Sequence, residues 1–451
     1  MANEYSNPEG TFRVCVVGLG KIGLPLAIQY VRQGMVVIGV DTNPDVVDTI
    51  RAGTPPFPGE HLLEEGLKRA LADGRFRATT STEEAVAASN VVVVVVPLVV
   101  DHTTKLPDFA GIDGAVSAIS KSLKGDTLVC FETTLPVGTT RTRFAPSLSA
   151  GSGLTLGSDL FVCFSPERVS SGQIFRDLSR YPKLVGAIDS ESAVRARSFY
   201  KAALTFDDRP DLQQPNGVWD LGSSEGAELA KLAETTYRDI NIAFANELAQ
   251  HCDSLGIDVG PVIAAANSQP FSHIHQPGIA VGGHCIPVYP HLYLQGHPEA
   301  RMPKASRAVN DRMPAYCVEA LAQLLGPLSG NTVAILGLAY RGGVKETSFS
   351  GCWALIDELS RRGASIVVHD PLYDDPEIRD FGLTPYSLGT AVDGVIVQTD
   401  HAEYQTLTPR DLPGAKGLID GRSVIRAIDL FAESGCQFAV LGRRSSVGTV
   451  A

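Results

Sequence analysis

The feature that most constrains this chain is a glycine-rich turn between a short apolar run and a helical pattern. Residues 13–17 form a short run rich in valine, and Gly18-Leu19-Gly20-Lys21-Ile22-Gly23 follows directly. An Ala- and Leu-bearing stretch then continues to Gln33. A GxGxxG sequence alone is a weak signal, but a strand before it and a helix after it are what a dinucleotide-binding unit needs. The chain is therefore predicted to open with a Rossmann-type domain.

Each glycine of this turn has a predicted task. Gly18 allows the tight turn, Gly20 lets the backbone approach a pyrophosphate, and Gly23 allows close packing of helix and strand. Asp41 stands 18 residues after Gly23, at the end of the next apolar run, where it can accept hydrogen bonds from a ribose. Its charge repels a 2′-phosphate, so NAD is favoured over NADP; the alternative is a turn whose glycines serve packing alone. The candidate cofactor contacts here are Gly18, Gly20, Lys21, Ile22, Gly23 and Asp41.

The composition argues against several classes of protein. The net charge of −12 gives no electrostatic reason to bind nucleic acid or an anionic membrane. The longest apolar run, residues 91–100, is broken by Pro97 and is too short to span a membrane. The N-terminal MANEYSNPEG lacks the basic and apolar regions of a signal peptide. Eight cysteines without a CxxC pair then indicate reduced thiols and a cytoplasmic protein.

The pattern of apolar runs predicts two α/β units joined by a helical connector. Residues 90–96, 127–131 and 160–164 continue the first parallel, doubly wound sheet, and residues 207–222 are interpreted as a surface loop. A long helix is predicted from Ser223 or Ser224 to about Leu255, closed by Gly256. A helix of this length needs a partner surface for its apolar stripe, which favours a homodimer.

A second α/β pattern begins at Thr332. Its predicted strands are 332–336, 364–369, 395–398, 417–419 and 438–441, with a helix over 352–362. We therefore expect an NAD-binding Rossmann domain over 1–206, a helical connector and dimerisation domain over 223–325, and a C-terminal α/β substrate-binding domain over 326–451.

Cys285 lies in the sequence Gly282-Gly283-His284-Cys285-Ile286-Pro287, where glycines and a proline indicate a rigid turn. A cysteine by itself is more often structural. In a chain that also binds a hydride acceptor, however, cysteine suits aldehyde oxidation through a thiohemiacetal and a thioester.

Several motifs in one order resemble the UDP-glucose/UDP-N-acetylmannosamine dehydrogenase family. The resemblance covers about residues 14–422, and the Ser-Pro-Glu-Arg-Val and Gly-Gly-His-Cys forms resemble its UDP-N-acetylhexosamine branch. The matching segments are 16–27 (VVGLGKIGLPLA), 132–140 (ETTLPVGTT), 165–169 (SPERV), 227–232 (AELAKL), 282–287 (GGHCIP) and 337–340 (GLAY).

The resemblance implies NAD-dependent oxidation of the C6 alcohol of a UDP-sugar to a uronic acid, as used in polysaccharide biosynthesis. It implies Cys285 as nucleophile, Lys231 as oxyanion or proton-relay group, Glu167 as general base and Thr134 as a residue that positions water or nicotinamide. The further cofactor contacts that it implies are Pro97, Thr134 and Arg341. The substrate contacts that it implies are Glu167, Arg168, Val169, Lys231, Gly278, Gly282, Gly283 and Tyr340.

The residues alone leave other interpretations open. Lys231 could be a solvated helix charge, Glu167 a surface ion partner of Arg168, and Thr134 a turn-forming hydroxyl. The sequence also departs from the family pattern, since Thr235 replaces an Asn and Tyr289 replaces an Asp. A tyrosine is neutral at pH 7 and cannot replace a carboxylate base. An NAD-dependent epimerase or isomerase, incomplete oxidation and a catalytically silent binding protein therefore remain alternatives.

Histidine clusters are weaker candidates. His369-Asp370 and Asp400-His401 both follow predicted strands, and His273, His275 and His284 lack a fourth ligand at the spacing of a zinc site. No metal is predicted.

Overall fold

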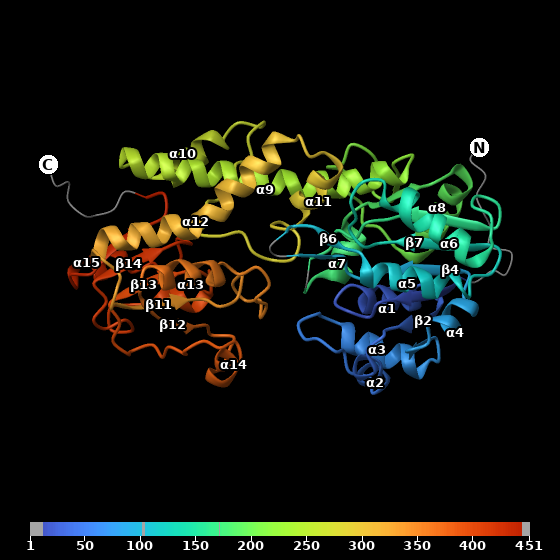
Figure 1. Cartoon of the computed structure of the whole chain (residues 1–451), viewed down its shortest axis with the longest axis horizontal. Helices are drawn as coiled ribbons and strands as arrows, with labels where there is room; N and C mark the ends of the chain where they lie inside the picture. Colours follow the sequence, from blue (N-terminus) through green and yellow to red (C-terminus); the bar gives the residue numbers. More distant parts are fainter. Residues whose placement is uncertain (1–11, 102–103, 171, 444–451) are drawn as a thin grey trace. The chain divides into compact units, whose positions relative to one another are not determined.

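The computed structural model describes residues 12–101, 104–170 and 172–443. The chain divides into two compact units, Met1–Ala233 with His291–His297 and Glu234–Pro290 with Pro298–Ala451. The expected absence of a signal peptide concerns residues 1–11, which lie outside the described residues. Figure 1 shows the first unit in blue to green and the sheet of the second unit in orange to red.

The first unit contains an eight-stranded sheet in the order β10-β9-β8-β7-β4-β1-β2-β3. All neighbours are parallel except β8 and β9, which are antiparallel, so the sheet is mixed where an all-parallel one was expected. The strands are β1 (Arg13–Val17), β2 (Val36–Val40), β3 (Phe76–Thr79), β4 (Val91–Val94), β7 (Thr127–Phe131), β8 (Leu160–Phe164), β9 (Lys183–Ala187) and β10 (Val218–Asp220).

The valine run of β4 shows why this sheet is covered on both faces. Val91 and Val93 belong to one buried apolar cluster, while Val92 and Val94 belong to the cluster on the opposite face. Side chains alternate along a strand, so a continuous apolar run serves a strand with helices on both sides. The two faces carry α1 (Gly23–Arg32), α3 (Leu63–Ala72) and α8 (Ser190–Ala203) on one side and α4 (Thr82–Ala87), α5 (Ala110–Ser120) and α6 (Ala145–Ser152) on the other.

The helices and small strands of the first unit alternate with the strands of the sheet. They are α1 (Gly23–Arg32), α2 (Pro44–Arg51), α3 (Leu63–Ala72), α4 (Thr82–Ala87), β5 (Val99–Val100), β6 (Pro107–Asp108), α5 (Ala110–Ser120), η1 (Thr140–Phe144), α6 (Ala145–Ser152), α7 (Ile174–Arg180) and α8 (Ser190–Ala203).

The predicted long helix is confirmed as α9 (Ser224–Leu255), which has 32 residues. The segment before it was expected to be a loop throughout, yet it contains β10. This three-residue strand pairs in parallel with β9 and adds the last strand to the sheet edge. A strand this short has no periodicity that a sequence pattern could show.

The second unit contains a five-stranded parallel sheet in the order β12-β11-β13-β14-β15. Its strands are β11 (Thr332–Leu336), β12 (Ser365–His369), β13 (Gly394–Val397), β14 (Gly417–Asp420) and β15 (Gln437–Val440). The remaining helices of the chain are α10 (Val259–Ala266), α11 (Tyr289–Gly296), α12 (Arg301–Leu325), α13 (Gly351–Arg361), α14 (Asp375–Asp380), η2 (Ala402–Thr406) and α15 (Ile428–Glu433).

Within the second unit, α9 and α12 are joined by buried polar side chains. Asp239 on α9 accepts hydrogen bonds from Arg307, Asn310 and Ser306 of α12, at 2.6, 2.8 and 2.9 Å. Because Asp239 is fully buried and paired, this cluster fixes the register of the two helices.

The loop that follows β11 is held by Asp370. Its Oδ2 atom accepts the N–H groups of Leu338 and Ala339, both at 2.8 Å, and lies 3.1 Å from Nε2 of His401. These contacts give Asp370 and His401 a structural role. Asp400 accepts the N–H of Gly342 at 2.8 Å, and Nδ1 of His369 lies 3.0 Å from the hydroxyl of Tyr404. Among the described residues, no group of three or more His, Cys, Asp or Glu side chains is placed to hold a metal ion.

Within the three described ranges, no helix combines the length and the apolar character that crossing a membrane requires.

Candidate active site

The glycine turn after β1 has the geometry that dinucleotide binding needs. Gly18 has φ +97°, and a Cβ atom at Gly23 would lie 1.8 Å from the carbonyl oxygen of Gly18. Both positions are therefore restricted to glycine, the first by its backbone conformation and the second by packing. A Cβ at Gly20 would meet nothing within 4 Å, so that side of the turn is open. No side chain caps the N-terminus of α1, which leaves backbone N–H groups able to bind phosphate.

Asp41 is fixed beside this turn at the end of β2. Its Oδ2 accepts the N–H of Leu19 at 3.0 Å, and its Oδ1 accepts the N–H of Asn43 at 3.0 Å. Asp41 is half-buried, and the bond from Leu19 ties its carboxylate to the turn. The turn, the uncapped helix and the placed acid together fit NAD. Lys21 and Ile22 lie in the same turn, and Pro97 follows β4 at the surface.

Thr134 lies after β7 in a segment that Glu228 ties to α9. Glu228 is fully buried, and its carboxylate accepts the N–H groups of Gly138 and Thr140 at 2.5 and 2.9 Å, and the hydroxyl of Thr140 at 2.7 Å. Burial raises the pKa of Glu228 to about 7, although these donors oppose the rise. The segment bearing Thr134 is thereby attached to the helix turn that bears Lys231.

Glu167 pairs with a buried lysine that the sequence did not single out. Nζ of Lys183 lies 2.9 Å from Oε2 of Glu167 and 2.8 Å from Oε2 of Glu132. Burial alone would raise the pKa of Glu167, but Lys183, the N–H of Arg168 and Lys231 outweigh burial and hold this pKa below its usual value. Glu167 is therefore a carboxylate at neutral pH. Its main ion partner is the buried Lys183, whereas the alternative interpretation was a surface pair with Arg168.

Lys231 and Arg168 also take defined places in the first unit. Lys231 is 6% exposed and acts electrostatically on Glu167, which is not the environment of a solvated helix charge. The guanidinium of Arg168 donates to the carbonyl of Pro182 at 2.6 Å, and Val169 packs at the edge of the buried cluster. Because Lys231 lowers the pKa of Glu167 electrostatically, these two candidate residues lie in the same part of the first unit.

Cys285 differs from every other cysteine of the chain. Seven of the eight cysteines are buried, and Cys285 alone is partly exposed. Its carbonyl accepts the N–H groups of Val288 and Tyr289 at 3.2 and 2.9 Å, so Cys285 begins the turn that leads into α11. Burial raises the pKa of the thiol to about 12 in both Cys15 and Cys317, which makes these two poor nucleophiles.

The two glycines before Cys285 pack against Tyr340. A Cβ at Gly282 would lie 2.6 Å from Cβ of Tyr340, and Gly283 has φ +90° with its own Cβ position 3.1 Å from the Tyr340 ring. The N–H of Gly283 donates to the carbonyl of Ser348 at 3.0 Å. The loop of Cys285 is therefore attached to the loop that follows β11, where Arg341 is exposed.

Gly278 and Arg422 complete the candidate residues of the second unit. The N–H of Gly278 donates to Oδ1 of Asn246 at 2.9 Å, and a Cβ at Gly278 would lie 2.7 Å from the Arg422 guanidinium. Arg422 donates to the carbonyls of Gln398 and Ala280 at 2.8 and 3.2 Å. Arg422 thus joins the loop before Cys285 to the second sheet.

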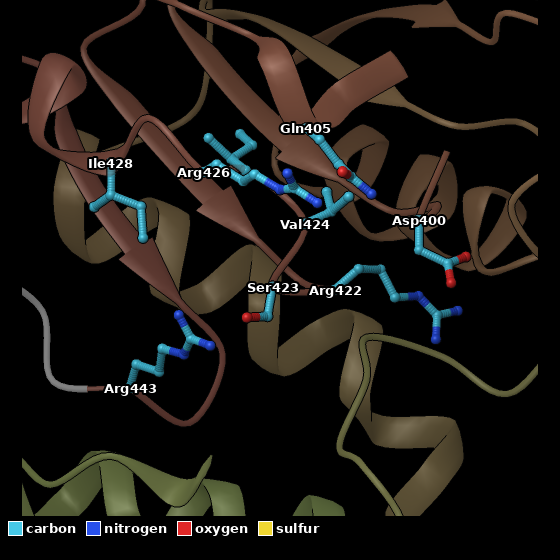
Figure 2. A pocket seen from close by; sticks show the side chains of 9 residues that line it. Asp400, Gln405, Arg422, Ser423, Val424, Arg426, Ile428 and Arg443 are labelled. Atoms are coloured by element: carbon cyan, nitrogen blue, oxygen red, sulfur yellow. The ribbon is translucent and has the colours of Figure 1, made fainter. Parts of the chain in front are cut away.

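Arg422 also lines a pocket of about 540 Å³ at the carboxyl ends of β13, β14 and β15. Figure 2 shows its guanidinium on the side of Asp400, with Ser423 between Arg422 and Arg443. Carboxyl ends of parallel strands are the usual ligand edge of such a sheet. The residues that line the pocket are Asp400, Gln405, Arg422, Ser423, Val424, Ile425, Arg426, Ile428 and Arg443.

Sequence reasoning missed Lys183, Glu132 and Arg422. Lys183 is the first residue of the fully buried strand β9, and Glu132 directly follows the fully buried strand β7. A charge beside such an apolar run is a signal of a buried pair. Arg422 follows Asp420-Gly421 directly after β14, at the ligand edge of the sheet. These positions could have been noted before the structure was known.

Two Rossmann-type units, one with a complete dinucleotide turn, define an NAD-binding α/β protein. Three family models match the chain: the NAD binding domain of the UDP-glucose/GDP-mannose dehydrogenase family at residues 12–204, its central domain at 225–312 and its UDP binding domain at 334–427. The chain belongs to this family and is an NAD-dependent nucleotide-sugar dehydrogenase.

Individual relatives agree with this assignment. The UDP-N-acetyl-D-mannosamine dehydrogenase of Pyrococcus horikoshii is 32% identical over 424 residues, which cover 92% of this chain and 96% of the relative. The solved structure of UDP-D-ManNAc dehydrogenase from P. horikoshii has a TM-score of 0.84 at 30% identity, covering 96% of this chain and 99% of that one. A UDP-glucose dehydrogenase of Pyrobaculum islandicum has a TM-score of 0.81 at 28% identity, covering 94% and 96%. The resemblance to the UDP-N-acetylhexosamine branch is confirmed.

Proposed function

We propose that this enzyme oxidises the C6 alcohol of a UDP-N-acetylhexosamine to the uronate, in two successive oxidations and through a thioester on Cys285. The observation that carries the proposal is the contrast among the cysteines. Cys285 alone is partly exposed, in a turn that glycines and Tyr340 hold in place. The names of the relatives favour N-acetylmannosamine as the sugar.

Three side chains of the enzyme carry the main steps. Lys231 assists removal of the hydroxyl proton in the first oxidation, while the aldehyde stays bound. The sulfur of Cys285 then adds to the aldehyde carbon as the thiol proton passes to the aldehyde oxygen, which gives a thiohemiacetal. Loss of a hydride and of that hydroxyl proton gives the thioester. Glu167 takes a proton from water as the new C–O bond forms, and the C–S bond breaks to release the uronate. A first and then a second NAD, bound in turn, would supply the hydride acceptor for the two oxidations, so two NAD are used per turnover.

The remaining candidate residues position the cofactor and the substrate in this proposal. Thr134 orients water or the nicotinamide, while Pro97 and Arg341 add contacts to the cofactor. Arg168, Val169, Gly278, Gly282, Gly283 and Tyr340 bind the substrate. We propose the domain limits 1–206 for NAD binding, 223–325 for the connector and dimerisation, and 326–451 for binding of the UDP-sugar.

A panel of UDP-, GDP- and dTDP-sugars tests this function. We expect two NADH per sugar with a UDP-N-acetylhexosamine, and a product heavier than the substrate by one oxygen and lighter by two hydrogens. Net NADH of zero with a rearranged sugar would instead establish the epimerase or isomerase, which Tyr289 in place of an Asp favours. No turnover with any sugar would favour a binding protein.

Cofactor choice gives a second test. A hydrogen bond to a charged group contributes about 1.5–3 kcal/mol, so losing the ribose contact and meeting a 2′-phosphate should weaken NADP binding about 10- to 100-fold relative to NAD. Asp41→Asn keeps the size of the side chain and should lose most of this discrimination. Equal affinities for the two cofactors in fluorescence titrations of the unmodified enzyme would refute the role of Asp41.

We further propose a homodimer through α9. Tyr237, Phe244 and Leu255 are 61%, 52% and 58% exposed, and their spacing of seven and then eleven residues places them on one face of the helix. Light scattering should give twice the chain mass, and Tyr237→Lys with Phe244→Lys should give a monomer. Leu430→Lys, at an exposed leucine elsewhere, is the matched control and should stay dimeric. A wild-type monomer at micromolar concentration would refute the proposal.

A further inference from the structure

Glu132, Lys183 and Glu167 form a continuous charged row from the core of the first unit to its surface. Their side chains are 0%, 3% and 10% exposed, so only the Glu167 end approaches solvent. Nζ of Lys183 lies within 2.9 Å of one oxygen of each carboxylate. The row therefore contains two carboxylates and one ammonium group.

Two tyrosines fix the inner carboxylate. The hydroxyls of Tyr30 and Tyr200 donate to Oε1 of Glu132 at 3.1 and 2.7 Å, while Lys183 binds Oε2. Both oxygens of Glu132 are thus occupied, and its orientation toward Lys183 is set. The other groups that face the row are Cys130, Cys163, Lys231 and the N–H of Arg168.

We propose that Glu132 is a positioning residue for hydrolysis: as the second counterion of Lys183, it keeps that ammonium paired whenever Glu167 binds a proton. This inference rests on the proposed role of Glu167 as the general base. When water attacks the thioester, one O–H bond breaks, its proton goes to Glu167, and a C–O bond forms. The C–S bond then breaks, the sulfur leaves as a thiolate, and the second proton of the water is released as the uronate ionises.

The physical reason is the cost of an unpaired buried charge. If Lys183 had Glu167 as its single counterion, protonation of Glu167 would leave a buried ammonium without a partner, and Glu167 would resist accepting the proton. Glu132 removes this obstacle because its carboxylate remains beside Lys183. Burial raises the pKa of Glu132, but the hydrogen bonds from Lys183 and Tyr200 oppose that rise and favour its carboxylate form. Lys183 is also among the groups that keep the pKa of Glu167 low.

Two substitutions should move the pH dependence of hydrolysis in opposite directions. In Glu132→Gln, Lys183 pairs with Glu167 alone. The acid limb of the pH profile of the hydrolysis rate should therefore move to lower pH by about one to two units. The weaker base should also slow hydrolysis about three- to tenfold on the plateau. In Lys183→Met, two carboxylates lose their shared cation, and the acid limb should move to higher pH by about one to three units. Lys183→Arg keeps the charge and should return the limb toward the wild-type position.

The measurement follows the acyl-enzyme directly. Excess enzyme is mixed with UDP-N-acetylmannosamine and NAD, quenched in acid at set times, and the adduct on Cys285 is quantified by intact mass at each pH. NAD titration and circular dichroism check that each variant is folded. If Glu132→Gln does not fold, the milder Glu132→Asp withdraws the carboxylate from Lys183 and should give a smaller shift to lower pH.

The outcomes separate this inference from the proposed function. Two results would overturn the inference alone. In the first, the acid limb for decay of the adduct is the same in the Glu132 variant as in the wild type. In the second, this limb moves in the same direction in the Glu132 and Lys183 variants. The absence of any adduct in every variant, Glu167→Gln included, overturns both the inference and the proposed thioester.

Discussion

Replacing Cys285 with serine should stop the second oxidation far more completely than the first. Lys231 and NAD can still support oxidation of the alcohol, but a serine hydroxyl without a dedicated base adds poorly to an aldehyde. We expect the second oxidation to slow on the order of 10³-fold or more, because loss of a covalent nucleophile commonly costs more than loss of a general base. The yield should fall from two NADH per sugar to at most one, with an aldehyde as the trapped product.

His284→Gln is the matched control for this variant. It changes the neighbouring exposed side chain, whose contact with Glu346 is 3.5 Å long, and leaves the thiol and its turn intact. It should retain both oxidations. A Cys285→Ser enzyme that still forms two NADH per sugar at the wild-type rate would show that the sulfur is not the nucleophile.

Replacing Glu167 with glutamine should give the second large effect, on hydrolysis alone. Removal of a general base slows a reaction about 10²–10⁴-fold, so the thioester should accumulate. Both oxidations precede hydrolysis, and the expected time course is therefore a burst of two NADH per active site followed by slow turnover. Stopped-flow absorbance at the NADH band measures the burst and the slow phase separately.

Glu225→Gln provides a control that removes a carboxylate from the same unit. Glu225 pairs with Arg141 near the start of α9 and is not a candidate site residue. Its variant should show no burst and near wild-type turnover. If the Glu167→Gln enzyme also showed no burst and near wild-type turnover, Glu167 would not be the general base.

The sequence predicted those parts of the molecule that local rules determine. The turn from Gly18 to Gly23 follows from backbone conformation and close packing, and the valine run of β4 follows from burial on both faces of a sheet. The long helix α9 begins after Ser223, whose hydroxyl accepts the N–H of Gly226, and ends before Gly256, which has a positive φ, so its predicted ends agree with the structure. Each of these signals lies within a few residues of the element that it defines.

Contacts between distant segments could not be predicted in the same way. The row of Glu132, Lys183 and Glu167 joins three separate strands or strand ends, and no spacing along the chain predicts that they meet. The reversal of β9 against β8 depends likewise on the path of the chain between them. The buried charges were visible in the sequence as exceptions within apolar runs, but their partners were not.

The most direct test of the proposed mechanism is the intact mass of the Glu167→Gln enzyme after incubation with UDP-N-acetylmannosamine and NAD. The account predicts an increase equal to the bound uronyl nucleotide, mapped by peptide analysis to Cys285 and absent from the double variant with Cys285→Ser. An unmodified Cys285 in an enzyme that still releases uronate at the wild-type rate would contradict it.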